Sequence, residues 1–454
     1  MRIFPEILTL NSYCIGFYPL LCSSRAASKP LLRINKTSTV FPRMLYLIWQ
    51  IKREQWLPPE KIERIQELRL KEMVEHAYSN TQFYRDLFTR CGVTPHDIET
   101  VDDLKKIEPT TKKDLQENFD AMVARGYSEK NCRPGYTTGS TGTPAKILYD
   151  SYAQDYFRAL SMIEFTETGY RPWERLAYTK RSPWRSHILQ KVGLLRSYHI
   201  NSTLPDEKQA DVLRKVNPSL IVSYPTLLYT IARKVKEKRY SIHPTAALIG
   251  GEVLTPHTRS YIEDVFSTHI YETYATIEFA TIARECSHGN WHIHSTQNVV
   301  EFEDGKILVT GLINKALPLI RYDIEDRGHP RDGLCPCGRG LPMMQMLEGR
   351  CGDIFVLPDG REIPPPKVAG VRVILDTNLA AKRYQMIQED CDRFTIKIVP
   401  TERFTPEISQ KIKEELIRDL EYPVDVDVEL VDEILLTDDR KLRVNISKVY
   451  KEKE

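Results

Sequence analysis

The sequence predicts an α/β protein with a large N-terminal domain of βα units, built on mostly parallel sheets, and a small α+β domain at the C-terminus. The chain has 454 residues, 41% of them hydrophobic, which suits a large core and is too long for one ordinary domain. In its middle, short apolar runs alternate with helical stretches, as in βα units. Near its end, two segments of alternating apolar residues flank an amphipathic stretch, which indicates a small sheet with a helix against it.

Composition argues against several classes of function. The net charge is +2, so the chain lacks the basic footprint of a nucleic-acid-binding protein. No apolar run approaches the length that spans a bilayer, which predicts a soluble protein with no membrane partner. The nine cysteines are sparse in a chain of this length, so we expect a reduced, cytoplasmic location and no disulfide scaffold. A homodimer is left open.

Residues 1–57 form an N-terminal extension whose role the sequence does not indicate. The apolar run from Ile15 to Leu21 makes a poor secretory signal, because Pro5 and Asn11 interrupt the approach to it. For residues 1–43, a disordered extension, or a start at Met44, fits better than a signal or a membrane anchor.

From Pro58 onward the pattern is helical. Leu70, Met73, Val74 and Ala77 recur at i, i+3, i+4 and i+7, which puts them on one face of a helix. We expect this face to pack into the core.

The segment from Tyr136 to Lys146 reads YTTGSTGTPAK. Its two glycines free the backbone to bend, while hydroxyl and N–H donors converge, an arrangement that suits phosphate oxygens. No Gly-Lys-Ser/Thr closes the segment, which excludes a Walker loop. A solvated turn is the alternative, and the apolar ILYD that follows is the expected strand. The candidate phosphate ligands are Thr137, Thr138, Gly139, Ser140, Thr141, Gly142 and Thr143.

Further along, short apolar runs at 220–222, 246–249 and 269–271 indicate strands of the predicted sheet. Ligands of such sheets collect where strands end and loops begin. The loop Gly250-Gly251-Glu252 follows the second run, and the segment YETYATIEFA begins at Tyr271, the last residue of the third. Both loops are candidate binding segments.

Cysteine and histidine residues gather in two neighbouring segments. Three thiolates and one imidazole would suit tetrahedral zinc in a structural site, which needs no open position. The alternative is a set of free thiols near a surface histidine cluster. The residues are Cys286, His288, His292, His294, Cys335 and Cys337.

These segments resemble the adenylate-forming ligases, the acyl-CoA synthetase superfamily. The glycine-rich segment is similar to the superfamily's phosphate loop, Ser/Thr-Gly-Ser/Thr-Thr-Gly-x-Pro, and looks most like the phenylacetate-CoA ligase and capsule-biosynthesis branch. Residues 274–278 resemble its Tyr-Gly-x-Thr-Glu motif, LPLIRYDIEDRG its Tyr-Arg-Thr-Gly-Asp segment, and LEGRCGD its hinge. The resemblance covers nearly everything after residue 58. It implies an AMP-binding domain over 58–350 and a mobile C-terminal domain over 351–454.

The resemblance also implies roles for single residues. Tyr274 would stack on adenine, with Gly251 and Glu252 in the loop along it, and Glu278 would act in catalysis by holding Mg²⁺ on the phosphates. Ala275 and Thr276 lie between these two positions as nucleotide contacts, Ala275 in place of the family's glycine.

The third motif and the hinge imply further contacts. Asp326 would accept the ribose hydroxyls, since two carboxylate oxygens can take both protons, and Asp323 is its rival. Arg350 would contact the nucleotide, and Asp353 would be the pivot of the domain motion.

Members of the superfamily end with a catalytic lysine in a Gly-Lys pair, which here falls on Lys441. Arg440 stands in the glycine position, and Arg443 and Lys448 are alternatives, as is a solvated basic strand edge.

Several members of the branch carry zinc, with the histidine in the place of His292. The resemblance therefore implies a structural zinc ion held by Cys286, His292, Cys335 and Cys337.

We therefore expect an ATP-dependent ligase that activates a carboxylic acid as the acyl-adenylate and passes the acyl group to coenzyme A. The resemblance to the phenylacetate-CoA ligase branch implies that this acid is an aryl acid. Its cofactors would be ATP/AMP, Mg²⁺ and zinc, with coenzyme A as co-substrate. The alternatives are an adenylyltransferase for a deazaflavin coenzyme and a non-catalytic nucleotide-binding protein.

Overall fold

The computed structural model describes residues 40–136, 145–180, 183, 188–252, 254, 256–348, 355–363, 368, 370–371, 374–375, 378, 380–434 and 444–449. The chain divides into two compact units. The first contains residues up to 137, 145–169 and 271–348, and the second contains residues 170–270 and 349–454.

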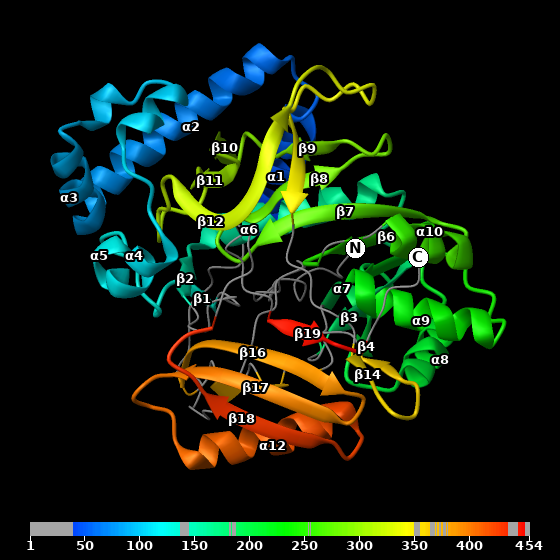
Figure 1. Cartoon of the computed structure of the whole chain (residues 1–454). Helices are drawn as coiled ribbons and strands as arrows, with labels where there is room; N and C mark the ends of the chain where they lie inside the picture. The colour runs from blue at the N-terminus through cyan, green and yellow to red at the C-terminus, as the bar shows by residue number, and fades with distance from the viewer. Residues whose placement is uncertain are drawn as a thin grey trace, which may run out of the picture. The chain divides into compact units, whose positions relative to one another are not determined.

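The first unit begins with helices, drawn in blue and cyan in Figure 1. The expected apolar face of the helix after Pro58 is confirmed, because Leu70, Met73, Val74 and Ala77 of α2 are all buried. Its neighbour α3 begins at the side-chain cap of Thr81, which accepts a hydrogen bond from the Tyr84 N–H. The helices are α1 (Val40–Glu54), α2 (Pro59–Asn80), α3 (Gln82–Cys91), η1 (Pro95–Asp97), η2 (Asp102–Lys106), α4 (Lys112–Glu117), α5 (Phe119–Met122) and α6 (Ser151–Glu167).

Helix α1 lies within the segment predicted to be an extension. Its residues Leu47 and Ile51 are buried in a cluster with Tyr156 and Leu160 of α6. The segment from Val40 to Glu54 is therefore a packed helix, whereas residues 1–39, most of the stretch predicted to be disordered, lie outside the described residues.

The strands of the first unit pair antiparallel, in the order β10-β11-β12-β13-β9-β8-β7. They are β7 (His269–Thr276), β8 (Ala280–Glu285), β9 (Trp291–Ile293), β10 (Asn298–Glu303), β11 (Lys306–Gly311), β12 (Tyr322–Arg331) and β13 (Met343–Glu348). A separate hairpin pairs β1 (Arg133–Tyr136) with β2 (Lys146–Tyr149), which includes most of the strand expected after the glycine-rich segment.

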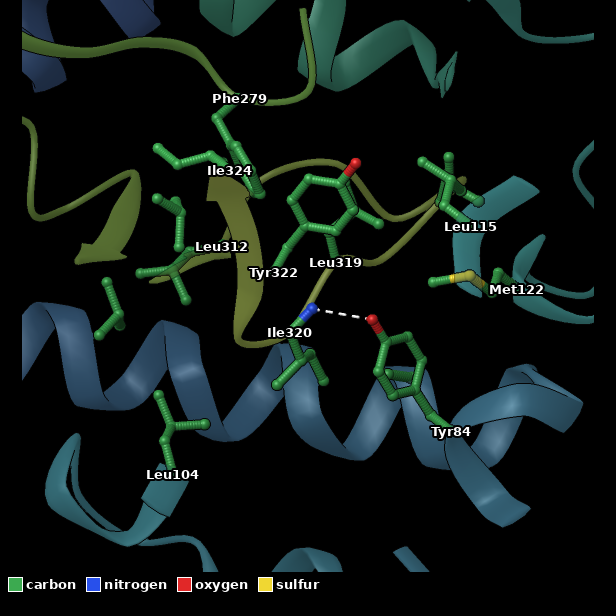
Figure 2. Close-up of a cluster of buried hydrophobic side chains, with 14 of the residues drawn as sticks. Tyr84, Leu104, Leu115, Met122, Phe279, Leu312, Leu319, Ile320, Tyr322 and Ile324 are labelled. Carbon is green, nitrogen blue, oxygen red and sulfur yellow. Dashed lines mark hydrogen bonds between the residues drawn. The ribbon is translucent and has the colours of Figure 1, made fainter. Parts of the chain in front are cut away.

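The core of the first unit joins the helices to these strands. Figure 2 shows Tyr84 of α3 reaching the backbone of Ile320, whose N–H donates to the Tyr84 hydroxyl at 2.8 Å. Tyr322 and Phe279 pack edge to face in the same cluster, 5.9 Å between ring centroids. The segment that leads into β12 is thus fixed by buried contacts.

In the second unit, β6-β5-β3-β4 are parallel neighbours. Helices connect them, as the alternation in the sequence predicts, so the α/β class is confirmed. The elements are β3 (Arg175–Lys180), α7 (Ile188–Lys191), β4 (Arg196–Asn201), α8 (Asp206–Val216), β5 (Leu220–Ser223), α9 (Pro225–Glu237), β6 (Ala246–Gly250) and α10 (Pro256–Phe266).

The C-terminal residues of the second unit form the expected small α+β arrangement, in orange and red in Figure 1. Its sheet has the order β18-β17-β16-β19, and α12 covers it with Ile408, Ile412 and Leu416. The elements are β14 (Phe355–Val356), β15 (Glu362–Ile363), β16 (Ala381–Asp390), β17 (Arg393–Pro400), α12 (Pro406–Leu420), β18 (Asp425–Leu430) and β19 (Asn445–Ser447).

Candidate functional site

Two residues with predicted nucleotide roles meet in the first unit. The Tyr274 hydroxyl donates a hydrogen bond to Oδ2 of Asp326 at 2.8 Å. Tyr274 is on β7 and Asp326 is on β12, and three strands lie between them in the sheet order. Asp326 is buried and Tyr274 is half-buried, so an aromatic ring and a carboxylate are held together at a partly enclosed position.

The start of β12 is held in place from the N-terminal helical region. Thr110 brackets it with three hydrogen bonds: its N–H donates to Arg321 O at 2.9 Å, its hydroxyl to Ile320 O at 2.9 Å, and its carbonyl accepts from the Asp323 N–H at 2.8 Å. Tyr84 adds the fourth contact, to the Ile320 N–H. These bonds fix the backbone a few residues before Asp326.

Arg321 anchors the same segment through a buried ion pair. Its Nε donates to Glu301 at 3.0 Å and its Nη1 to the Ile107 carbonyl at 2.6 Å. Burial raises the pKa of Glu301 to about 6, although the guanidinium opposes that rise. The backbone at Arg321 and Glu325 has positive φ, +48° and +62°, which non-glycine residues adopt only where surrounding contacts hold them.

The rival carboxylate faces elsewhere. Asp323 Oδ1 accepts a hydrogen bond from the Glu325 N–H at 2.8 Å, and Oδ2 lies 3.7 Å from Lys306 Nζ. The structure therefore brings Asp326 to Tyr274, while Asp323 supports the turn before it.

Glu278 lies in the turn between β7 and β8. The Phe279 N–H donates to the Thr276 hydroxyl at 3.2 Å, which fixes the turn from inside. Ala275 and Thr276 pair with Thr281 and Ala280 across the hairpin. Glu278 is half-buried and lines a small pocket together with Phe157, Phe279, Gln297, Asn298, Gly311, Leu312, Ile313, Asn314, Leu317 and Leu319.

In the second unit, Gly251 and Glu252 follow β6 as expected. Gly251 has φ +82°, and a Cβ there would come within 3.0 Å of the Tyr224 ring, so this turn requires glycine.

In the C-terminal residues, Lys448 forms an ion pair with Glu389. The predicted residues Thr137, Thr138, Gly139, Ser140, Thr141, Gly142, Thr143, Arg350, Asp353, Lys441 and Arg443 lie outside the described residues.

The four predicted zinc ligands form one cluster. The ligand atoms of Cys286, His292, Cys335 and Cys337 all lie within 4.8 Å of one another. Cys286 Sγ is 3.6 Å from Cys335 Sγ, and Cys337 Sγ is 3.3 Å from His292 Nε2. Thiolates placed about 2.3 Å from a tetrahedral zinc would lie about 3.8 Å apart, whereas a disulfide needs about 2.05 Å. The donor set and its spacing fit a tetrahedral metal ion.

Outer contacts orient these ligands. His292 Nδ1 lies 3.3 Å from the Leu341 carbonyl, so Nε2 is the ring nitrogen that faces the cysteine sulfur atoms. Burial lowers the His292 pKa to about 4, which keeps the imidazole neutral, as a metal ligand must be. The Cys335 sulfur accepts hydrogen bonds from the Asn290 side chain at 3.1 Å and the Cys337 N–H at 3.5 Å. Such N–H groups stabilise thiolate sulfur.

Sequence reasoning missed the outer contacts of this cluster. Asn290 and Arg339 both contact its sulfur atoms, and each lies within four residues of a predicted ligand. Their polar side chains beside cysteine were the available signal, but only the folded chain shows where they point. The other two predicted histidines are not among the clustered ligand atoms: exposed His288 contacts the cluster through its N–H, which donates to Cys286 Sγ at 3.4 Å, and His294 lies 3.5 Å from buried Glu164.

Comparison with known proteins adds independent information. No protein-family model matches the chain. It is 25% identical over 384 residues to a phenylacetate-coenzyme A ligase of Thermus thermophilus, covering 78% of this chain and 85% of the relative. It is 24% identical over 332 residues to the phenylacetate-coenzyme A ligase of Escherichia coli K12, covering 66% and 73%.

Solved structures show a similar fold. A 2-hydroxyisobutyryl-CoA ligase in complex with 2-HIB-AMP and CoA superposes with a TM-score of 0.60 at 16% identity, covering 88% of this chain and 92% of that one. The same ligase with R3-HIB-AMP gives a TM-score of 0.58. Within the part of the chain that the structure describes, no helix is long and apolar enough to cross a membrane.

Proposed function

The chain is a member of the adenylate-forming superfamily, in the branch of the phenylacetate-CoA ligases, and on that premise we propose that its acid substrate is an aryl acid. As an AMP-forming acid–CoA ligase it activates a carboxylic acid with ATP and transfers the acyl group to coenzyme A. The curated relatives are CoA ligases, which favours this activity over the adenylyltransferase alternative.

The hydrogen bond between Tyr274 and Asp326 is the observation that carries the assignment of the nucleotide site. An aromatic face and a carboxylate side by side match what adenosine offers: a planar base and two vicinal hydroxyl donors. Tyr274 donates to one oxygen of Asp326 and so sets the carboxylate's orientation. Asp326 is therefore our ribose ligand, in preference to Asp323.

For the phosphate chemistry, we rely on the match of further residues to the superfamily motifs. We assign the phosphate contacts to residues 137–143 and Arg350, with Gly251 and Glu252 along the base. A bound Mg²⁺ would neutralise phosphate charge and lower the repulsion between ATP and the acid. Glu278 is the residue that would hold it. Lys441 would stabilise the charge that develops as pyrophosphate leaves, and rotation of the C-terminal residues about Asp353 would then remove it for thioester formation.

The cluster of Cys286, His292, Cys335 and Cys337 is our proposed zinc site. Four protein ligands leave no open position, which is the mark of a structural site. Zinc there would contribute folding energy to the segments that supply the ligands and take no part in acyl transfer.

The test is an acid-dependent ATP–pyrophosphate exchange assay with a panel of aryl and short aliphatic acids, followed by detection of the acyl-CoA product. We expect exchange with aryl acids, and thioester once coenzyme A is added. Exchange only with aliphatic acids would contradict the aryl assignment alone. Exchange without formation of a thioester would contradict the assignment of coenzyme A as the acyl acceptor. No exchange with any acid would favour a non-catalytic nucleotide-binding protein.

A further inference from the structure

Arg339 connects the cysteine–histidine cluster to the helices of the first unit. Its Nη1 lies 3.5 Å from Cys337 Sγ, its Nε donates to Gln55 Oε1 at 2.8 Å, and its Nη2 donates to Glu167 Oε2 at 2.9 Å. Its guanidinium carbon lies 4.7 Å from the centroid of the Trp56 ring, within the range of a cation–π contact. One side chain thus contacts a proposed metal ligand, the turn after α1, and the last residue of α6.

The loop that carries Arg339 sits directly on the turn between α1 and α2. The Gly340 N–H donates to the Gln55 carbonyl at 3.1 Å, and a Cβ on Gly340 would come within 1.9 Å of the Leu57 carbonyl oxygen. Only glycine permits this approach, because the Leu57 backbone cannot shift to relieve a clash as a flexible side chain can. The loop and the turn are therefore in backbone contact at Gly340, the residue after Arg339.

Glu167 is the other end of the connection. It accepts hydrogen bonds from Arg339, from Arg284 Nη1 at 3.0 Å, and from the Gln55 side chain. The Arg339 and Glu167 side chains are only 14% and 16% exposed. Solvent and salt therefore weaken the attraction between them less than they weaken a surface ion pair. The forked guanidinium of Arg339 contacts Gln55, Glu167 and Cys337 at once, which the single ammonium group of lysine cannot do.

On the basis of the zinc site proposed above, we propose that Arg339 is a positioning residue that couples the cysteine–histidine cluster to the α1–α2 turn and to the end of α6. When the cluster holds its metal, the Cys335–Cys337 loop is fixed, Arg339 is aimed at Gln55, Trp56 and Glu167, and the N-terminal helices are clamped to the strands. Outer contacts of this kind also act in the reverse direction, since they orient a ligand and stabilise its charge. Loss of Arg339 should therefore weaken both metal binding and the hold on the turn.

The test measures metal affinity and local amide exchange on the full chain, and needs no enzymatic activity. The variants are R339Q, which removes the charge and the fork, R339K, which keeps the charge alone, and R331Q, a matched control at an exposed position on β12. Zinc affinity is measured by competition with a chromophoric chelator. Hydrogen exchange is followed at residues 53–60 and at Gly340, with β11 as the reference segment.

For the wild type and R331Q, we expect slow exchange at 53–60 with zinc and faster exchange after chelation. R339Q should bind zinc roughly 10- to 100-fold more weakly. Even when saturated with zinc, it should exchange at 53–60 nearly as fast as the chelated wild type. R339K should recover part of the zinc affinity but not the slow exchange, because charge alone cannot bridge three partners.

Wild-type zinc affinity and exchange in R339Q would overturn the proposal, and so would chelation that leaves exchange at 53–60 unchanged in the wild type. A folded preparation with no zinc affinity would overturn it as well. If R339Q also exchanges faster at β11, the variant is misfolded. Zinc affinity and amide exchange at 53–60 are then compared between R339K and the control R331Q.

Discussion

Tyr274 and Asp326, 52 positions apart in the sequence, are joined by a hydrogen bond of 2.8 Å from the tyrosine hydroxyl to the aspartate carboxylate. The bond orients the carboxylate, and the contacts of Thr110 and Tyr84 fix the backbone just ahead of it.

If Asp326 accepts the ribose hydroxyls, D326A should raise the KM for ATP by about 10- to 100-fold, the usual cost of losing hydrogen bonds to a charged group. Y274F keeps the ring and loses only the orienting bond, so its effect should be smaller. The measurement is ATP–pyrophosphate exchange across an ATP titration. D323A is the matched carboxylate control, and a KM effect as large as that of D326A would reverse the assignment.

Substitution of Glu278 should affect the use of Mg²⁺ more than the binding of ATP. E278Q keeps the shape of the side chain but removes the charge that a hard cation prefers. We expect the magnesium concentration for half-maximal exchange to rise about tenfold or more, with little change in nucleotide affinity. Wild-type rates across the whole magnesium titration would show that Glu278 has another role.

The two half-reactions should respond differently to K441A. Loss of the ammonium should slow adenylation on the order of 10²-fold, because it removes a donor aimed at developing charge. Thioester formation from presynthesised acyl-adenylate should be nearly unaffected. K448A is the control, since Lys448 is paired with Glu389. Equal losses in both half-reactions, or a loss carried by K448A or R443A instead, would exclude Lys441.

The buried Glu301 should give stability a specific pH dependence. Burial raises its pKa from the usual 4.5 to about 6, so the fold favours the protonated form. That contribution is complete below pH 4.5 and is lost as the pH rises through about 6; its size is about 2 kcal/mol. Urea unfolding of the wild type between pH 4.5 and 7 should show this loss, and E301Q should flatten it. E99Q, at an exposed glutamate, should leave the slope unchanged; an identical slope in E301Q would contradict the prediction.

Freshly purified protein should contain about one zinc ion per chain. C335S should lose it, whereas C91S, at a cysteine outside the cluster, should retain it. Because structural zinc contributes folding energy, chelation should unfold the surrounding segment before nucleotide binding is lost. Metal analysis and thiol alkylation check this. Metal-free protein with all four ligand side chains freely reactive would rule the site out.

Several features of this protein follow from the sequence by itself. Leu70, Met73, Val74 and Ala77 predict their buried face because helical spacing is local. Cysteines and histidines in two neighbouring segments predict a metal site because ligand chemistry belongs to the side chains themselves, while the choice of His292 came from the family resemblance. The structure places the ligand atoms of Cys286, His292, Cys335 and Cys337 within 4.8 Å of one another.

Only the tertiary structure decided which distant residues meet. Asp326 and Asp323 are three positions apart and look alike in the sequence, yet only Asp326 reaches Tyr274, because Tyr84 and Thr110 hold the start of β12 in one conformation. Likewise nothing local to Arg339 shows that it reaches Gln55 and Glu167. Such contacts depend on how separate elements pack, and packing is a property of the whole chain.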